Sequence, residues 1–189
     1  MFLFFDTETT GLPKKWRAPV TDVNNWPRMV ELAWSLNHAD GRTVEEYRAV
    51  IRPEGFTIPK SSSDIHGITQ EIAEAEGIHL AEALRGFAEA VEKSEFVVGH
   101  NVSFDENIIG AEFIRKDIPH QLWNRERICT KLETTDYCAI PGKYGYKWPT
   151  LSELHEKVFG EKFDGAHTAL EDVRATVRCF FALKKLDVV

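Results

Sequence analysis

The sequence lacks several features that would mark a specialised class of protein. It has only three cysteines among 189 residues, and they are widely spaced with no CxxC pair: Cys129, Cys138 and Cys179. This usage argues against a disulfide framework or a zinc knuckle, and we expect buried thiols in a reducing compartment. No stretch approaches the ~18 apolar residues of a membrane span, and the apolar run 1–5 lacks the basic flank and length of a signal peptide. We therefore expect a soluble, cytoplasmic protein without membrane contact.

The sequence also lacks an excess of positive charge. Lysine and arginine number 23 against 30 aspartates and glutamates, which gives a formal net charge of -7. Proteins that bind nucleic acid usually carry a basic footprint, so a nucleic-acid partner would have to be held locally or through metal ions. A hydrophobic content of 43% and a charged content of 28% are ordinary for a globular chain. With no internal repeat, this length predicts one domain over residues 1–189.

The first part of the chain is typical of an antiparallel sheet. The short apolar run 2–6 ends in a turn and predicts a buried strand. Residues 28–37 and 43–52 are also strand-like, and the Asp40-Gly41 pair between them is a hairpin signal. We therefore expect these three strands to form an antiparallel meander.

The rest of the chain alternates helices and strands. Apolar residues at helical spacing predict an amphipathic helix over 80–93, and short strands are expected at 96–98 and 128–130, with a helix from Lys131 onward. Three more helices are expected to begin at capping boxes, which are Ser103 with Glu106, Thr150 with Glu153, and Thr168 with Glu171. The pattern predicts an α/β fold, a mixed five-stranded sheet flanked by helices.

Two carboxylates follow the first apolar run. Asp6 and Glu8 are two residues apart, so on a strand they point to the same side. Two ionised carboxylates this close repel each other unless a cation lies between them, and oxygen ligands suit Mg²⁺ or Mn²⁺. Asp105 and Asp172 are expected in the first turns of two helices, and His167 just before the second. The spacing alone does not bring these segments together.

Three motifs in order resemble those of a known enzyme family. DTETTGLP (6–13), HNVSFD (100–105) and HTALED (167–172) are similar to the exonuclease motifs of the histidine-bearing branch of the DEDD superfamily, DEDDh. IHGIT (65–69) matches a segment that lines the substrate pocket in this branch. The chain looks most similar to the proofreading epsilon subunits of bacterial DNA polymerase III and their free-standing relatives. The resemblance implies an RNase H-like fold and 3′→5′ exonuclease activity on a single-stranded end.

The resemblance also implies roles for individual residues. Two divalent metal ions would be bound by the four acids, Asp6, Glu8, Asp105 and Asp172. His167 would act as the general base on the attacking water, which suits a histidine whose pKa lies near neutrality. The terminal nucleotide would be held by a further set of residues: Thr9, Leu12, Ile65, His66, Asn101 and Phe104.

Several alternatives stay open. Asp105 and Asp172 could simply interact with helix dipoles, and His66 could have a structural role in a turn. The substrate is expected to be DNA, as in proofreading or repair, but the same chemistry could act on RNA, and a catalytically inactive binding module is a third possibility. A polymerase partner is possible, although the last helix is expected to end near Lys185, which leaves no room for the polymerase- and clamp-binding tail of epsilon.

Two segments carry weaker signals. KYGYKW (143–148) interleaves lysines with aromatic residues, a composition suited to single-stranded nucleic acid, although an ordinary loop explains it equally well. Residues 13–27 look longer than the corresponding turn in epsilon. This segment could be a substrate lip, a partner surface or a packed flap.

Overall fold

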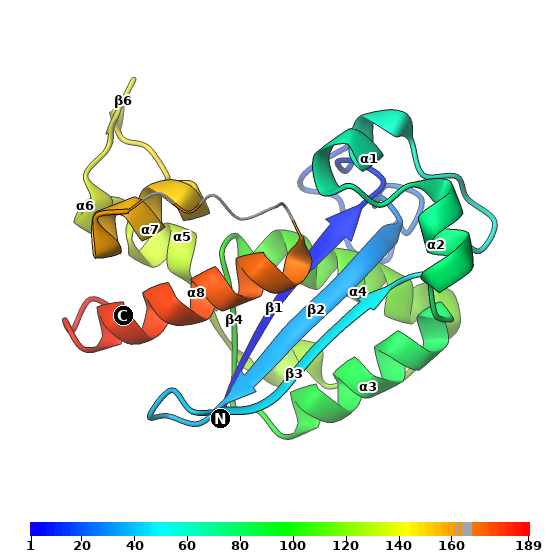
Figure 1. Cartoon of the computed structure of the whole chain (residues 1–189), viewed down its shortest axis with the longest axis horizontal. Coiled ribbons are helices and arrows are strands. Elements are labelled where there is room, and N and C mark those ends of the chain that lie inside the picture. Colours follow the sequence, from blue (N-terminus) through cyan, green and yellow to red (C-terminus); the bar gives the residue numbers. More distant parts are fainter. Residues whose placement is uncertain (162, 164–167) are drawn as a thin grey trace.

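A mixed five-stranded sheet forms the centre of the computed structural model, which describes residues 1–161, 163 and 168–189 (Figure 1). The strands lie in the order β3-β2-β1-β4-β5. Strands β1, β2 and β3 pair antiparallel, whereas β4 and β5 run parallel to β1. Their bounds are Phe2–Thr9 (β1), Met29–Asn37 (β2), Thr43–Val50 (β3), Phe96–Gly99 (β4) and Glu126–Cys129 (β5). The predicted meander and the RNase H-like mixed sheet are confirmed.

Helices cover both faces of this sheet. Side chains of β1 alternate between them: Phe5 contacts Phe87 of α3 with ring centroids 5.3 Å apart, whereas Phe4 contacts Phe180 of α8 at 5.2 Å. Because the side-chain period of a strand is two, positions 6 and 8 of β1 lie on the α8 side. The helices concerned are α3 (Leu80–Glu92) and α4 (Val102–Lys116) on one face and α8 (Ala169–Lys184) on the other.

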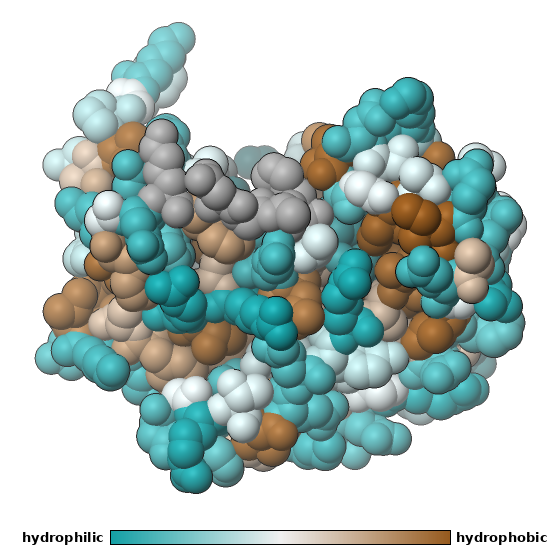
Figure 2. All heavy atoms as spheres, viewed as in Figure 1, coloured by the Kyte–Doolittle hydropathy of each residue, from teal (hydrophilic) through white to brown (hydrophobic). Residues whose placement is uncertain are grey.

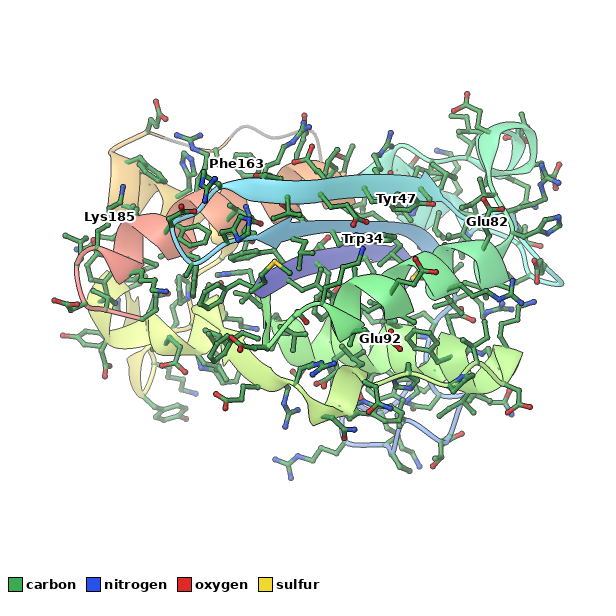
Figure 3. All side chains as sticks on the ribbon, turned by 90° about the horizontal axis from the view of Figure 1, so that it is seen from below. Trp34, Tyr47, Glu82, Glu92, Phe163 and Lys185 are labelled. Atoms are coloured by element: carbon green, nitrogen blue, oxygen red, sulfur yellow. The ribbon has the colours of Figure 1, made fainter. Side chains whose placement is uncertain are left out.

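The larger part of the core lies between the sheet and α3. Trp34 of β2 is only 1% exposed and stacks on Tyr47 of β3 with ring centroids 4.0 Å apart (Figure 3). Phe87 of α3 also contacts Trp34, with its ring edge-on at 5.7 Å. Burying a large aromatic side chain contributes on the order of 2–3 kcal/mol, so these contacts hold α3 firmly against the meander.

The remaining elements are short and lie outside the central sheet. Two of them, α1 and α2, form where we expected no helix. Helix α1 has seven residues between Pro59 and Gly67, whose φ of 75° ends it, and this is too short for a helical repeat to be recognised. The bounds are Lys60–His66 (α1), Gln70–Glu76 (α2), Leu122–Asn124 (η1), Thr130–Glu133 (α5), Thr135–Cys138 (α6), Pro141–Gly142 (β6), Gly145–Tyr146 (β7) and Leu151–Phe159 (α7).

The predicted capping boxes have different outcomes. The Thr150 box at the start of α7 is present in full, and the Thr168 hydroxyl accepts a hydrogen bond from the Glu171 N–H at the start of α8. The Ser103 box is wrong, because α4 begins at Val102 with Asn101 as its N-cap. Glu106 instead turns to the sheet and pairs with Arg127 of β5 at 3.0 Å.

The cysteines of the described residues form no disulfide. All three cysteines are free, with Cys138 and Cys179 buried and Cys129 partly buried. Burial raises the pKa of the Cys179 thiol to about 12, which makes it inert. Within the described part of the chain, no helix has both the length and the apolar character that a membrane crossing requires.

Candidate active site

Three carboxylates converge where the end of β1 meets the start of α8. Asp6 and Glu8 project from β1 on the α8 side, and Asp172 lies in the first turn of α8. One carboxylate oxygen from each lies within 4.8 Å of the others, a spacing that could hold a metal ion. The prediction that Asp6 and Glu8 share one face is confirmed. The fold brings Asp172 to them from near the other end of the chain.

Burial and mutual repulsion make this cluster hold protons unusually tightly. The pKa of Asp6 is raised well above its ordinary value, first by burial and then by the charges of Asp105, Asp172, Glu8 and Glu31. The pKa of Glu8 is raised to about 8, again first by burial and then by neighbouring acids. Near neutral pH the cluster must therefore be neutralised by bound protons or by a cation.

Asp105 approaches β1 from α4, on the opposite face of the sheet. Its Oδ1 accepts hydrogen bonds from the Thr7 N–H at 3.0 Å and the Thr7 hydroxyl at 2.7 Å. Burial raises the pKa of Asp105 to about 7, although the two bonds from Thr7 act in the opposite direction. Asp105 lies outside the set of three that share the 4.8 Å spacing, yet its charge contributes to the raised pKa of Asp6.

A fifth acid, Glu31, was missed by the sequence reasoning. It lies on β2 directly opposite Glu8 and is fully buried. One oxygen accepts a hydrogen bond from the Ala169 N–H at the start of α8 at 2.7 Å, and the other binds the Arg48 guanidinium at 2.5 Å. Glu31 therefore ties α8 to the sheet and so fixes the distance of Asp172 from β1. Its only sequence signal was a charged residue inside a largely apolar strand.

The predicted nucleotide-binding residues on β1 and α1 lie near the same strand end. A register irregularity between Glu8 and Thr9 ends the regular pairing of β1 with β2. The Thr9 hydroxyl donates to the Gly11 carbonyl at 2.7 Å, and Leu12 follows, 71% exposed. Helix α1 lies above this end of β1 (Figure 1), and its Ile65 is 64% exposed.

His66, by contrast, is buried at the end of α1. Its Nδ1 accepts a hydrogen bond from the Ile68 N–H at 3.1 Å, so Nε2 carries the proton when the ring is neutral. Burial lowers the pKa of His66, and the Thr9 backbone partly offsets this. The imidazole is therefore neutral at pH 7, and its Nδ1 stabilises the turn that follows α1. This turn contact is the structural alternative that the sequence allows for His66.

The two predicted residues at the start of α4 have different neighbours: Asn101 accepts a hydrogen bond from Lys131, whereas Phe104 lies beside the long segment 13–27. Asn101 caps α4 in the left-handed conformation, with φ of 86°. Phe104 is partly buried, and the exposed ring of Trp16 lies 5.9 Å from it. The segment is anchored on α4 through Arg115, whose guanidinium donates to the Val23 and Trp26 carbonyls. Residues 13–27 thus form a packed flap that presents Trp16 next to Phe104.

His167, the predicted general base, lies outside the described residues. Thus the structure brings Asp6, Glu8 and Asp172 into one cluster, holds Asp105 next to it through Thr7, and shows the surroundings of the predicted nucleotide-binding residues. The roles of these side chains in binding and catalysis stay predictions.

Comparison with known proteins agrees with the family predicted from the three motifs. The family model described as exonuclease matches residues 3–180. The PolC-type DNA polymerase III of Thermotoga petrophila is 36% identical over 191 residues, which cover 99% of this chain but only 12% of that protein.

Two solved structures show the same fold. E. coli Exonuclease I in complex with a dT13 oligonucleotide has a TM-score of 0.76 at 22% identity, over 97% of this chain and 40% of that one. Exonuclease X in complex with 5′ overhanging duplex DNA has a TM-score of 0.64 at 24% identity, over 98% of this chain and 92% of that one. The family match and the shared fold together show that the chain belongs to the exonuclease family.

Proposed function

We propose that residues 1–189 form a single exonuclease domain that removes nucleoside 5′-monophosphates from the 3′ end of single-stranded DNA. The observation that carries this proposal is the cluster of Asp6, Glu8 and Asp172, formed by two elements that the fold brings together. The relatives support DNA as the substrate, because one is a DNA polymerase and another was solved with a DNA oligonucleotide. A role in proofreading or repair, with a polymerase as partner, belongs to the same proposal.

The residues present fit divalent metal ions. Three carboxylates lie together, and their neighbours' charges raise the pKa of Asp6 and Glu8, so a hard cation would relieve repulsion there and bind oxygen ligands. Asp6, Glu8 and Asp172 would hold Mg²⁺ or Mn²⁺, and Asp105 would complete the ligands of a second ion next to Asp6. Two such ions would stabilise negative charge on the attacking and leaving oxygens of a phosphodiester.

The protein's own side chains would orient the substrate and move the proton. The exposed Leu12 and Ile65 offer apolar contacts to the terminal base, and Phe104 with Trp16 offers aromatic surface on the α4 side. Thr9, His66 and Asn101 would supply polar contacts at the edges of the same nucleotide. His167 would accept the proton of the attacking water as a general base.

The direct test is a time course on single-stranded DNA and RNA of the same sequence, each labelled at the 5′ end, with Mg²⁺ and with EDTA. We expect stepwise shortening of DNA in Mg²⁺ alone, with release of nucleoside 5′-monophosphates. A preference for short RNA would replace DNA by RNA as the substrate class. No cleavage of either, by a folded protein whose melting temperature Mg²⁺ does not raise, would favour the inactive binding module.

A pair of variants assigns the activity to the cluster. Asp6→Ala should abolish cleavage, whereas Asp64→Ala should leave it unchanged. Asp64 is a matched control, since it is an exposed aspartate whose described partner is Lys60 one turn earlier on α1. Equal activity of both variants would contradict the proposed metal site.

A further inference from the structure

The segment 141–148 forms a hairpin that presents aromatic and basic side chains to solvent. Strands β6 and β7 pair through Pro141 with Tyr146 and Gly142 with Gly145, and the hairpin projects away from the body of the protein (Figure 1). All eight residues are exposed. Tyr144 is 90% exposed, and Trp148 is 60% exposed. Because such aromatic surface contributes little to a core, its exposure points to contact with another molecule.

The base of the hairpin is fixed next to the second exonuclease motif. The ring of His100 bridges two elements, since its Nε2 lies 3.0 Å from the Pro149 carbonyl and its Nδ1 lies 3.0 Å from the Thr130 hydroxyl. A carbonyl can only accept, so Nε2 carries the proton and Nδ1 accepts from Thr130. Pro149 is buried, and Thr150 then starts α7. Trp148 is therefore held in one place although its ring is exposed.

A cavity of about 460 Å³ lies between Trp148 and the start of α4. Its lining includes His100, Asn101, Lys131, Lys147 and Trp148. Its volume is within the range of small-ligand sites. The cavity therefore continues from the predicted contact of the terminal nucleotide at Asn101 to the exposed indole ring.

The charges in this cavity suit a phosphate backbone. The Lys131 ammonium lies 4.8 Å from the centroid of the Trp148 ring and donates to the Asn101 side-chain oxygen at 3.3 Å. Of the two lysines given for the lining of this cavity, Lys147 is paired with Glu153 at 2.5 Å, so Lys131 is the one that a phosphate would meet. The chain as a whole is acidic, with a net charge of -7, whereas this cavity beside the second exonuclease motif places a lysine over an exposed indole. An aromatic platform next to a basic group is how single-stranded nucleic acid is bound without sequence preference.

We propose that Trp148, Lys131 and the β6–β7 hairpin bind single-stranded DNA upstream of the terminal nucleotide, with a base stacked on Trp148 and its phosphate near Lys131. This inference rests on the proposed function, since it assumes that the 3′ end lies at the carboxylates. The hairpin and the α1–α2 region are two raised parts of the surface, at the upper left and upper right of the molecule (Figure 2). The strand would enter past the hairpin and end at β1.

The test compares a substrate that reaches Trp148 and Lys131, which we call the platform, with one that does not. The long substrate is a twelve-nucleotide oligothymidylate, and the short one is the p-nitrophenyl ester of thymidine 5′-monophosphate, which occupies only the terminal site. We expect Trp148→Leu to lower the ratio of kcat/KM for the long substrate over the short one roughly 5- to 100-fold, the range for one base–aromatic stack. Trp123→Leu is the matched control, because Trp123 is also exposed, at 48%, but lies before the start of β5, whereas Lys131 and the cavity follow its end. Both variants are first compared with the wild type by thermal melting.

A binding measurement keeps the proposal testable if the protein cleaves neither substrate. Fluorescence anisotropy of the labelled oligothymidylate in EDTA should show roughly 5- to 100-fold weaker binding by Trp148→Leu, and Lys131→Gln should reduce the dependence of binding on salt. An unchanged ratio and unchanged binding in Trp148→Leu would overturn the platform. Absence of cleavage by the wild type, with binding that still depends on Trp148, would overturn the proposed function but support the platform.

Discussion

Replacing Glu8 by glutamine should stabilise the metal-free protein at alkaline pH, although Glu8 is a proposed metal ligand. The pKa of Glu8 is 4.5 in the unfolded chain and about 8 in the folded one. Between these values the unfolded state loses the proton that the folded state keeps, so the unfolded state binds fewer protons. Stability therefore falls as pH rises from about 4.5 to about 8, and no penalty exists below that window.

The size of the effect follows from the same values. One pKa unit corresponds to about 1.4 kcal/mol, so a pKa raised from 4.5 to about 8 gives an upper limit of about 5 kcal/mol above pH 8. Glu8 is partly exposed, and water screens part of this cost. We expect Glu8→Gln to raise the free energy of unfolding by about 1–3 kcal/mol, or the melting temperature by roughly 2–10 °C for a chain of this size.

The assay is thermal unfolding followed by circular dichroism in EDTA, at pH 5 and at pH 8.5. The two proteins should differ little at pH 5, and the variant should be the more stable at pH 8.5. Saturating Mg²⁺ should reverse the order, because only the wild type keeps all the proposed ligands. Glu153→Gln serves as control, since bonds from Lys147 and Thr150 lower the pKa of Glu153 and its neutralisation should not stabilise. A Glu8→Gln protein no more stable than the wild type at pH 8.5 in EDTA would refute the reasoning.

Three further predictions concern other residues. Asp6→Ala should abolish exonuclease activity while raising the metal-free melting temperature, because it removes one of the repelling carboxylates; gel assays and melting curves check both. His167→Ala should slow turnover roughly 10²–10⁴-fold yet leave the Mg²⁺-induced rise in melting temperature intact, and an unchanged kcat would remove it from the role of general base. Glu31→Ala should lower the free energy of unfolding by about 1–3 kcal/mol in Mg²⁺, because it leaves the Ala169 N–H unpaired. Glu31→Gln should retain most of the wild-type stability. Equal losses in the two variants, measured by urea denaturation, would contradict this positioning role.

Local patterns in the sequence predicted much of the fold. Strand β1 was recognised by its apolar run, the β2–β3 hairpin by Asp40-Gly41, and α7 by the reciprocal bonds of Thr150 and Glu153. These predictions hold because each depends on interactions between residues close in the chain. The Ser103 capping box failed for the complementary reason: a partner distant in sequence, Arg127, pairs with Glu106 and removes it from the cap.

The sequence by itself determined the residue types of the candidate site and the shared face of Asp6 and Glu8, because strand alternation is a local property. Tertiary structure alone decided that Asp172 joins them, that Asp105 reaches the cluster through Thr7 from the other face, and that the buried Glu31 anchors α8. These juxtapositions follow from how helices pack on the two faces of the sheet. No local pattern encodes that packing, because it depends on side chains far apart in the chain.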